Sequence, residues 1–202
     1  MSGDQDSLQD WAGAQNLGLT LVFTDIVNST SIGIKLGDTR WIESVFEHFS
    51  TARTLALLYD CFVVKVIGDS LMMAFRRPSE AVQFAVRFAG DTGVDYIGIR
   101  VGIHSGEVEI RENDIYGLNV NLTSRVQHVL PSEGILATQS VQKDYVRRHG
   151  MGTSVRFMPR EVDLKSFGRE VVFLVRDGKT MQAIRRQRAA RHALLGLIGA
   201  GE

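Results

Sequence analysis

The sequence predicts an α+β fold with a ferredoxin-like βαββαβ core and a small αβ extension at its C-terminal end. An apolar run at residues 19–23 indicates a buried strand. A second apolar segment at 62–75 indicates two short strands joined by a tight Gly68-Asp69 turn. Segments with apolar residues at helical spacing lie between them, so the order is strand, helix, strand, strand, helix, strand.

Each element has its own local signal. Residues 38–59 carry an apolar stripe at helical spacing that we expect to pack in the core, with Asp38 as the N-cap. Pro78 suits the first turn of a helix that ends near Gly90. The stripe consists of Trp41, Ile42, Val45, Phe46 and Phe49, followed by Leu55, Ala56 and Leu58. The remaining elements are expected as strands at 96–104 and 107–110 around a Ser105-Gly106 turn, a helix at 119–130, a strand at 135–138, a helix at 139–147, and strands at 154–161 and 170–176.

Three segments divide the chain. Residues 1–16 are polar and contain glycine, so we expect a frayed N-terminal arm or linker with one helical turn around Trp11. Residues 17–178 form the main domain. Residues 179–202 form a basic amphipathic helix, which can lie on an anionic membrane or on a partner. Docking of this helix on its own domain is the simpler expectation.

The composition excludes several classes of protein. The chain has 202 residues, 44% of them hydrophobic, which suffices for one domain with a core. Lys plus Arg and Asp plus Glu number 23 each, so there is no general electrostatic attraction to nucleic acid. Cys61 is the only cysteine, which excludes an intramolecular disulfide and favours a reducing compartment and a buried, inert thiol. We find no secretory signal, no Cys/His cluster for zinc and no apolar run of ~18 residues that could span a bilayer.

Two carboxylates occupy positions suited to binding metal and phosphate. Asp25 ends the first strand and precedes Asn28, Ser29 and Thr30, whose free N–H groups at a helix N-terminus can hold an anion. Asp69 lies at the hairpin tip and shares a rim with Asp25 if the hairpin pairs with the first strand. Divalent ions ~4 Å apart, held between such carboxylates, assist displacement at phosphorus. A helix cap at Asp25 and an ordinary turn at Asp69 are the alternatives.

Four segments resemble, in order, those of the class III nucleotidyl cyclases. They are Phe-Thr-Asp-Ile-Val-Asn-Ser-Thr from Phe23, Lys-Val-Ile-Gly-Asp-Ser from Lys65, Arg-Val-Gly-Ile-His-Ser-Gly from Arg100, and Asp-Ile-Tyr-Gly-Leu-Asn-Val-Asn-Leu-Thr-Ser-Arg from Asp114. The resemblance covers about residues 19–176. It implies the class III cyclase homology domain and the conversion of a nucleoside triphosphate to a 3′,5′-cyclic nucleotide and pyrophosphate.

The resemblance implies roles for residues at the metal and phosphate end. Asp25 and Asp69, with the backbone of Ile26, resemble the ligands of two ions, Mg²⁺ or Mn²⁺, while the amides that follow cradle the triphosphate. One ion would lower the pKa of the ribose 3′-hydroxyl, and the other would assist the departure of pyrophosphate. Arg100 resembles a further phosphate-contacting arginine; a strand residue facing solvent is the alternative.

Lys65 and Asp114 resemble the pair that reads the base. A lysine donates and a carboxylate accepts, which matches the edge of adenine. Guanine presents the reverse order of acceptor and donor, and a mispaired polar group discriminates strongly. The resemblance therefore favours ATP over GTP. A solvated lysine and an ordinary loop acid are the alternatives.

Asn121 and Arg125 are four residues apart and share one helix face. They resemble the pair that orients the ribose and neutralises charge growing on the phosphate oxygens. Lys165 resembles the lysine that grips the terminal phosphates, although Ser166 stands where glycine is more usual. His104 needs no role beyond packing.

In this family the metal carboxylates and the base-reading set come from opposite protomers, so the resemblance implies a homodimer with two shared sites. We therefore expect a cytoplasmic adenylyl cyclase that uses ATP, to which an upstream sensor domain could attach before Leu17. A guanylyl cyclase and a silent nucleotide-binding dimerisation module are the alternatives. Diguanylate cyclase chemistry ranks low, because the chain has no Gly-Gly-Asp/Glu-Glu-Phe run.

Overall fold

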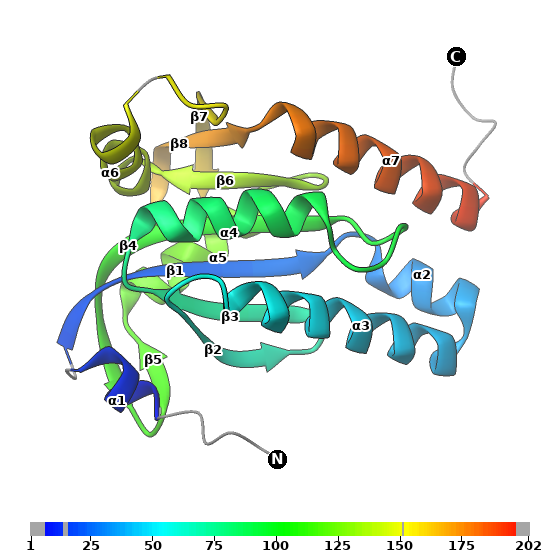
Figure 1. Ribbon diagram of the computed structural model, residues 1–202, viewed down its shortest axis with the longest axis horizontal. Helices are drawn as coiled ribbons and strands as arrows, with labels where there is room; N and C mark the ends of the chain where they lie inside the picture. Colours follow the sequence, from blue (N-terminus) through cyan, green and yellow to red (C-terminus); the bar gives the residue numbers. More distant parts are fainter. Residues whose placement is uncertain (1–6, 14–15, 151, 197–202) are drawn as a thin grey trace.

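The computed structural model describes residues 7–13, 16–150 and 152–196. Its helices are α1 Leu8–Ala12, α2 Ser29–Leu36, α3 Asp38–Ala56, α4 Pro78–Gly90, α5 Leu118–His128, α6 Gln139–His149 and α7 Gly178–Leu195. Its strands are β1 Asn16–Ile26, β2 Cys61–Ile67, β3 Ser70–Phe75, β4 Ile99–Arg111, β5 Asp114–Tyr116, β6 Gly134–Thr138, β7 Arg156–Leu164 and β8 Gly168–Arg176. They form one sheet in the order β2-β3-β1-β4-β6-β8-β7, with β5 paired to β4 (Figure 1).

The predicted βαββαβ core is confirmed. The strands β1 to β4 lie in the order β2-β3-β1-β4, and each neighbouring pair within this set is antiparallel. The C-terminal extension adds β6 parallel to β4 and closes with the β7–β8 hairpin. This strand order places the ends of β1 and of the β2–β3 hairpin beside each other, as the shared-rim hypothesis requires.

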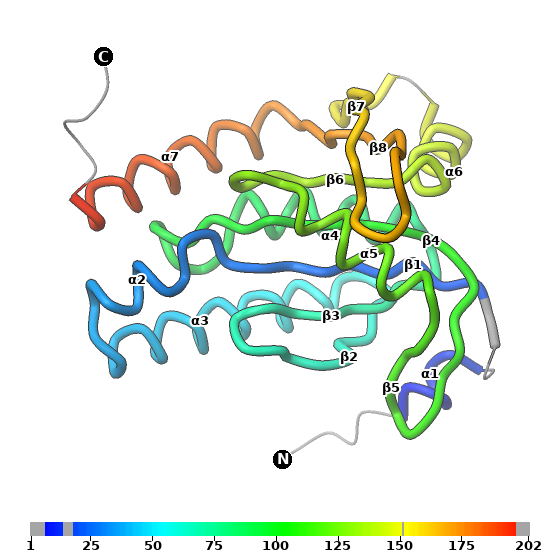
Figure 2. Tube along the Cα trace, turned by 180° about the vertical axis from the view of Figure 1, so that it is seen from behind, coloured from blue at the N-terminus to red at the C-terminus, as the bar shows by residue number. Residues whose placement is uncertain are grey.

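Helices cover both faces of the sheet. Helices α3, α4 and α6 lie on one face of the sheet (Figure 1). An apolar cluster that includes Phe49, Phe75, Phe84 and Phe88 fills this α3/α4 face. The α5 face, seen from in front in Figure 2, carries α5 and the short α1. Helix α7 packs on α4 and α2. A residue on a strand therefore faces one of two different environments, according to its place in the strand alternation.

The expected turn at Ser105-Gly106 is wrong. Strand β4 runs unbroken from Ile99 to Arg111, and all eleven residues of β1 pair with it. A Cβ added to Gly106 would lie 2.5 Å from Cγ of Asn119, so this glycine is required by the close approach of α5 and not by a turn. The chain reverses later, at Glu112 and Asn113, which adopt φ values of 49° and 61°.

Residues 7–13 of the predicted N-terminal arm are packed on the domain and are not frayed, whereas residues 1–6 and 14–15 lie outside the described residues. The expected helical turn is present as α1, and Leu8 is fully buried against the α5 face. Its backbone N–H donates to Oδ1 of Asn113 at 2.6 Å, and Trp11 donates from Nε1 to Asp60 at 3.0 Å. Strand β1 also begins at Asn16, earlier than predicted. The helical turn is held on the domain because its side chains are buried by residues that are distant in the sequence.

The apolar stripe of α3 is only partly in the core. Phe49 is buried, as expected, but Ile42 and Phe46 are 51% and 66% exposed. Leu58, which follows the end of the helix at Ala56, is 60% exposed, so core packing is wrong for these three residues. The N-cap of α3 is Gly37, and Asp38 is the first helical residue.

His48 gives a test of how α3 packs. This side chain is fully buried, stacks on Phe88, and its Nδ1 donates to the backbone carbonyl of Thr92 at 3.0 Å. Burial lowers the pKa of His48 from 6.5 to about 4, against the opposing effect of the Thr92 hydrogen bond. Folding therefore favours the neutral ring, and the associated stability is complete above pH 6.5 and is lost as the pH falls through about 4.

We expect this single residue to remove roughly 3 kcal/mol from the free energy of unfolding between pH 6.5 and 4. Urea denaturation across that range measures the loss. His48→Gln, which keeps a donor toward Thr92 but does not titrate, should show a correspondingly shallower pH dependence. Parallel curves for the two proteins would contradict the assignment.

Candidate active site

The two predicted metal carboxylates lie on one rim of the sheet, where neighbouring strands end. Asp25 is the penultimate residue of β1, and Asp69 lies in the two-residue turn between β2 and β3. Because β3 pairs with β1, Oγ of Ser70 donates to Oδ1 of Asp25 at 3.0 Å. Gly68 adopts φ 61° at this turn, a conformation that glycine tolerates without strain. The expected pairing of the hairpin with the first strand is thus confirmed.

Arg100 is the partner of Asp25 in the structure. The two residues are opposite each other on β4 and β1, and Nη2 of Arg100 forms an ion pair with Oδ2 of Asp25. The side chain of Arg100 is 25% exposed, so the alternative of a solvent-facing strand residue is wrong. This guanidinium offsets the charge of Asp25, and a cation or a phosphate would compete for either member of the pair.

The donor set fits a hard divalent ion. Oδ2 of Asp69 is buried and has no hydrogen-bond partner among the described residues, which leaves a carboxylate oxygen available for a ligand. Carboxylate and carbonyl oxygens suit Mg²⁺ or Mn²⁺. Among the described residues, no three or more His, Cys, Asp or Glu side chains lie close enough together to hold a metal ion. Oxygens of substrate or water would therefore have to complete the coordination. Mg²⁺ is commonly held in this way, by few carboxylates together with phosphates.

A helix N-terminus adjoins these carboxylates. Asn28 caps α2 with φ 61°, yet its side chain makes no capping hydrogen bond. The first-turn amides of Ser29 and Thr30 therefore have no cap, and no acidic residue occupies this turn. The N–H of Val27, the residue directly before Asn28, donates to the carbonyl of Gly98 at 2.9 Å, which anchors the chain between β1 and α2. The geometry suits an anion.

Lys65 and Asp114 meet although 49 residues separate them. Nζ of Lys65 lies 2.5 Å from Oδ2 of Asp114, and the two side chains are 39% and 23% exposed. A β-bulge makes this contact possible: the pairing of β2 with β3 skips Val64, so Lys65 aligns with Met72 on the α5 face. Without the bulge, the alternation would turn Lys65 to the α3/α4 face.

Asn121 and Arg125 lie on α5. Asn121 is exposed and Arg125 half-buried, while Val126 is fully buried and supplies the packing side of the helix. The side chains of Asn121 and Arg125 form no hydrogen bond or ion pair with other side chains or backbone groups of the described residues. Both side chains are therefore free to meet a ligand.

Lys165 lies in the exposed turn between β7 and β8. Ser166, which follows it, adopts φ 71°, the left-handed conformation in which glycine is more usual. A serine tolerates this conformation at a cost of about 1 kcal/mol. Ser166 therefore preserves a tight turn although it stands where the family more often has glycine.

A pocket of about 600 Å³ contains part of the predicted site. It is lined by Ser29, Thr30 and Asp69, together with Ile42 and Phe46 of α3. Neither Asp25 nor Arg100 lines this pocket, and neither do Asp114, Asn121, Arg125 and Lys165. Lys65 lines a neighbouring pocket that shares Phe46 with this one.

His104 has more contacts than packing alone requires. Its Nε2 bonds to Oδ1 of Asn119 on α5, and its Nδ1 to Oγ1 of Thr138, each at 2.9 Å. Burial lowers the pKa of His104, so the neutral ring is favoured. Gly102 and Gly106 lie two residues to either side on the same face, where α5 approaches too closely for a side chain. The Gly-x-His-x-Gly spacing was the available sequence signal, because these residues share one face of a strand.

The comparisons with known proteins identify the family of the chain. Residues 14–175 match the family described as "Adenylate and Guanylate cyclase catalytic domain". An adenylate cyclase of Streptomyces griseus is 31% identical over 130 residues, which make up 63% of this chain and 32% of that protein. A receptor-type adenylate cyclase of Trypanosoma brucei brucei, ESAG 4, is 26% identical over 170 residues, with 60% of this chain and 14% of that protein covered. The match thus spans no more than about a third of the length of these two relatives.

Solved structures agree on the fold. An adenylate cyclase of Trypanosoma brucei, described in its monomeric state, superposes with a TM-score of 0.68 at 24% identity, covering 78% of this chain and 87% of that one. No helix among the described residues is long and apolar enough to cross a membrane. The family match covers most of the chain and the solved structures share its fold, and the chain belongs to the class III nucleotidyl cyclase catalytic domains.

Proposed function

We propose that this protein is an adenylyl cyclase, which converts ATP to 3′,5′-cyclic AMP and pyrophosphate at the interface of a homodimer. The observation that carries the proposal is the contact between Lys65 and Asp114, which presents a donor and an acceptor side by side at 2.5 Å. That order of groups complements adenine. The site would lie in the cytoplasm, where ATP is abundant. The greater length of the relatives supports, as a further proposal, a sensor domain joined upstream.

In the proposed reaction the 3′-oxygen of the ribose attacks the α-phosphorus, and the bond from that phosphorus to the bridging oxygen of pyrophosphate breaks. Asp25 and Asp69 would hold two divalent ions, which lower the pKa of the 3′-hydroxyl and offset charge on the leaving group. The amides at the start of α2 would receive phosphate oxygens. The proton of the hydroxyl would pass to solvent.

The second set of residues acts on the ribose and the departing charge. Asn121 would orient the ribose by hydrogen bonding, and Arg125 would neutralise charge that grows on the phosphate oxygens. Lys165 would hold the terminal phosphates. Arg100, paired with Asp25 in the structure, would exchange this carboxylate for a phosphate oxygen when ions bind.

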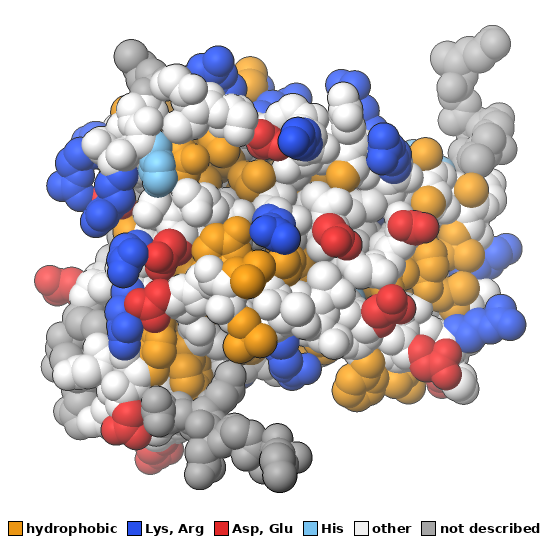
Figure 3. All heavy atoms as spheres, in the orientation of Figure 1, with side chains coloured by type: hydrophobic (Ala, Val, Ile, Leu, Met, Phe, Trp, Pro, Cys, Tyr) orange, Lys and Arg blue, Asp and Glu red, His pale blue; other side chains and the backbone are white. Residues whose placement is uncertain are grey.

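A homodimer is proposed because the family resemblance assigns the two sets of residues to opposite protomers, and this one chain carries both sets. Exposed apolar side chains surround the pocket at Asp69 and continue along α3 and β2, and apolar groups reach the surface over α3 in Figure 3. They are Ile42, Phe46, Leu57, Leu58, Val66 and Ile67. A patch of this kind typically marks an interface. Two equivalent sites would follow from twofold symmetry.

Base choice gives the first test of the pair. In Lys65→Met and Asp114→Asn, one member of the donor–acceptor pair is neutralised, so the preference for ATP over GTP should fall by about 10-fold or more. Turnover of both nucleotides under identical conditions measures the ratio. Lys179→Met removes an exposed lysine of α7 and should leave the ratio unchanged. An unchanged ratio in both site variants would remove Lys65 and Asp114 from base recognition.

The proposal as a whole is tested by incubating the purified chain with ATP or GTP and Mn²⁺. We expect cyclic AMP and pyrophosphate in equal amounts, much less product from GTP, and none after the metal is chelated. Preferred turnover of GTP would make the protein a guanylyl cyclase. Nucleotide binding without turnover would make it a silent dimerisation module.

A further inference from the structure

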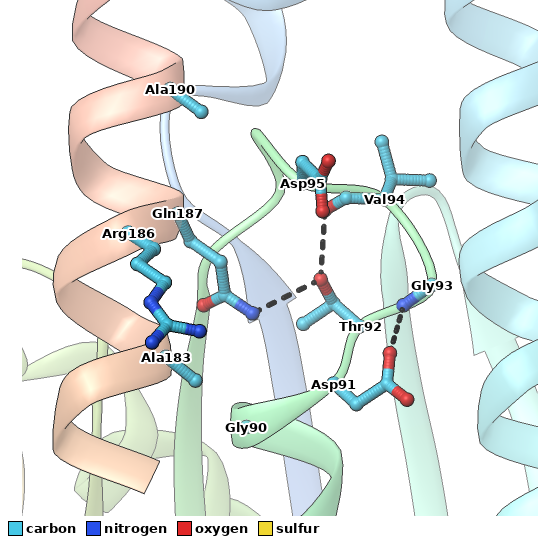
Figure 4. A pocket seen from close by; sticks show the side chains of 10 residues that line it. All are labelled: Gly90, Asp91, Thr92, Gly93, Val94, Asp95, Ala183, Arg186, Gln187 and Ala190. Carbon is cyan, nitrogen blue, oxygen red and sulfur yellow. Dashed lines mark hydrogen bonds between the residues drawn. The ribbon is translucent and has the colours of Figure 1, made fainter. Parts of the chain in front are cut away.

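Helix α7 lies beyond the residues that match the family, yet it is built into the domain. The family match ends at residue 175, and α7 begins at Gly178. Oγ1 of Thr180 donates to the carbonyl of Val86 on α4 at 3.0 Å. Farther along, Nε2 of Gln187 donates to Oγ1 of Thr92 at 3.4 Å, across a cavity of about 350 Å³ (Figure 4). This helix is therefore tied to α4 and to the loop that leads into β4.

Arg191 is the most deeply buried charged residue of α7. It is 2% exposed, and its Nη2 lies 2.9 Å from Oε2 of Glu133. Arg188 contacts the other oxygen of Glu133 at 2.6 Å. Nε and Nη1 of Arg191 are buried without a hydrogen-bond partner among the described residues. Burying a cation with unpaired donors is costly, and an apolar residue often stabilises such a position as well, so stability is a poor reason for an arginine here.

The guanidinium of Arg191 lies directly over Gly98. A Cβ added to Gly98 would fall 2.7 Å from Nη1 of Arg191, so any other residue at this position would require the guanidinium to shift. The carbonyl of the same Gly98 accepts the N–H of Val27 at 2.9 Å. Val27 stands between Ile26 and Asn28, in the segment that joins the metal edge of β1 to the N-terminus of α2. We call Asp25 and the segment from Ile26 to the first-turn amides of Ser29 and Thr30 the metal and phosphate cradle. Helix α7 and this cradle thus contact the same glycine, Gly98.

We propose that Arg191 is a positioning residue that acts through Gly98 on Val27, and thereby holds the metal and phosphate cradle in its working geometry. This rests on the proposed cyclase function for its kinetic consequences, but not for its structural ones. Helix α7 is then a part of the catalytic apparatus. Anything that shifts α7 would change the affinity for the metal–nucleotide complex.

Hydrogen exchange tests the structural step without any need for activity. In Arg191→Met, the amide of Val27 should exchange about 10-fold faster or more, because local opening governs its protection. Amides of β3, which lie outside this path, should keep their rates. Arg188→Met removes the other partner of Glu133 without touching Gly98, and Arg185→Met removes an exposed arginine of the same helix. Neither control should alter exchange at Val27.

Kinetics test the functional step. For Arg191→Met, KM for ATP and the Mn²⁺ concentration at half-maximal rate should rise several-fold, by roughly 3- to 30-fold for a sub-ångström displacement of the cradle. The preference for ATP over GTP should stay the same, because Lys65 and Asp114 lie on the other face. A general loss of folded protein would lower the apparent kcat for both nucleotides and leave KM unchanged, so the rise in KM is the result that a mere loss of stability would not give. Gly98→Ala displaces the guanidinium from the opposite side and should give the same pattern.

Unchanged exchange at Val27 in both Arg191→Met and Gly98→Ala would overturn the proposal. A uniform rise in exchange along the whole chain would do the same, since it would reduce Arg191 to a stability residue. If the wild-type protein makes no cyclic nucleotide, the cyclase proposal fails, while the exchange at Val27 still decides the role of Arg191.

Discussion

Asp25→Ala and Arg125→Ala, each nearly inactive alone, should recover activity when the two proteins are mixed. Each substitution removes an interaction needed in the transition state, so we expect losses of about 100-fold or more. Mixed dimers contain one site with both defects and one intact site. With random exchange of subunits in equal amounts, the recovered rate should approach about a quarter of the wild-type rate.

Asp25→Ala mixed with Asp69→Ala is the matched control. Both residues belong to the same set at one edge of the sheet, so no mixed dimer contains an intact site. Cyclic AMP is measured in each mixture after subunit exchange has been confirmed with differently labelled chains. Absence of recovery in the first mixture, or recovery in the control, would refute the shared site.

Phe46→Asp should yield a folded monomer with at least ~100-fold less activity, since incomplete sites lack the positioned groups of the partner. The side chain of Phe46 is 66% exposed in the single chain, on the rim of the pocket that contains Asp69. A charge at an exposed position should change the stability of one chain by no more than about 0.5 kcal/mol. The same charge would oppose burial in a dimer interface.

Light scattering and turnover are measured on the same samples at equal concentration. Lys143→Asp places the same carboxylate on an exposed position of α6 and should alter neither property. A fully active monomer, or a Phe46→Asp protein that remains an active dimer, would show that this surface is not the interface on which catalysis depends.

Several parts of the site could be predicted because their signals are local. Asp25 follows a continuous apolar run, and Asp69 follows a glycine between two strand segments, so both carboxylates could be assigned to strand ends. The pairing of the hairpin with β1 then follows from the ferredoxin-like order. The order of the core elements is confirmed, so the periodicity of the apolar residues was sufficient to predict it.

Other features depend on contacts between distant segments. Ser105 and Gly106 resemble a turn when only their neighbours are considered, yet Gly106 lies mid-strand because Asn119 of α5 packs against it. Ile42 and Phe46 have the spacing of core residues, but spacing cannot tell a surface buried within one chain from one left for a partner.

By itself, the sequence determined the order of the elements, the two acidic strand ends and the spacing of Asn121 and Arg125, because each is set by residues a few positions apart. Only the tertiary structure decided that Lys65 meets Asp114, through a bulge that skips Val64 and reverses the alternation of β2. Only the tertiary structure placed Arg191 over Gly98. The physical reason is that bulges and buried ion pairs are stabilised by groups far apart in the chain, which leave no periodic pattern in the sequence.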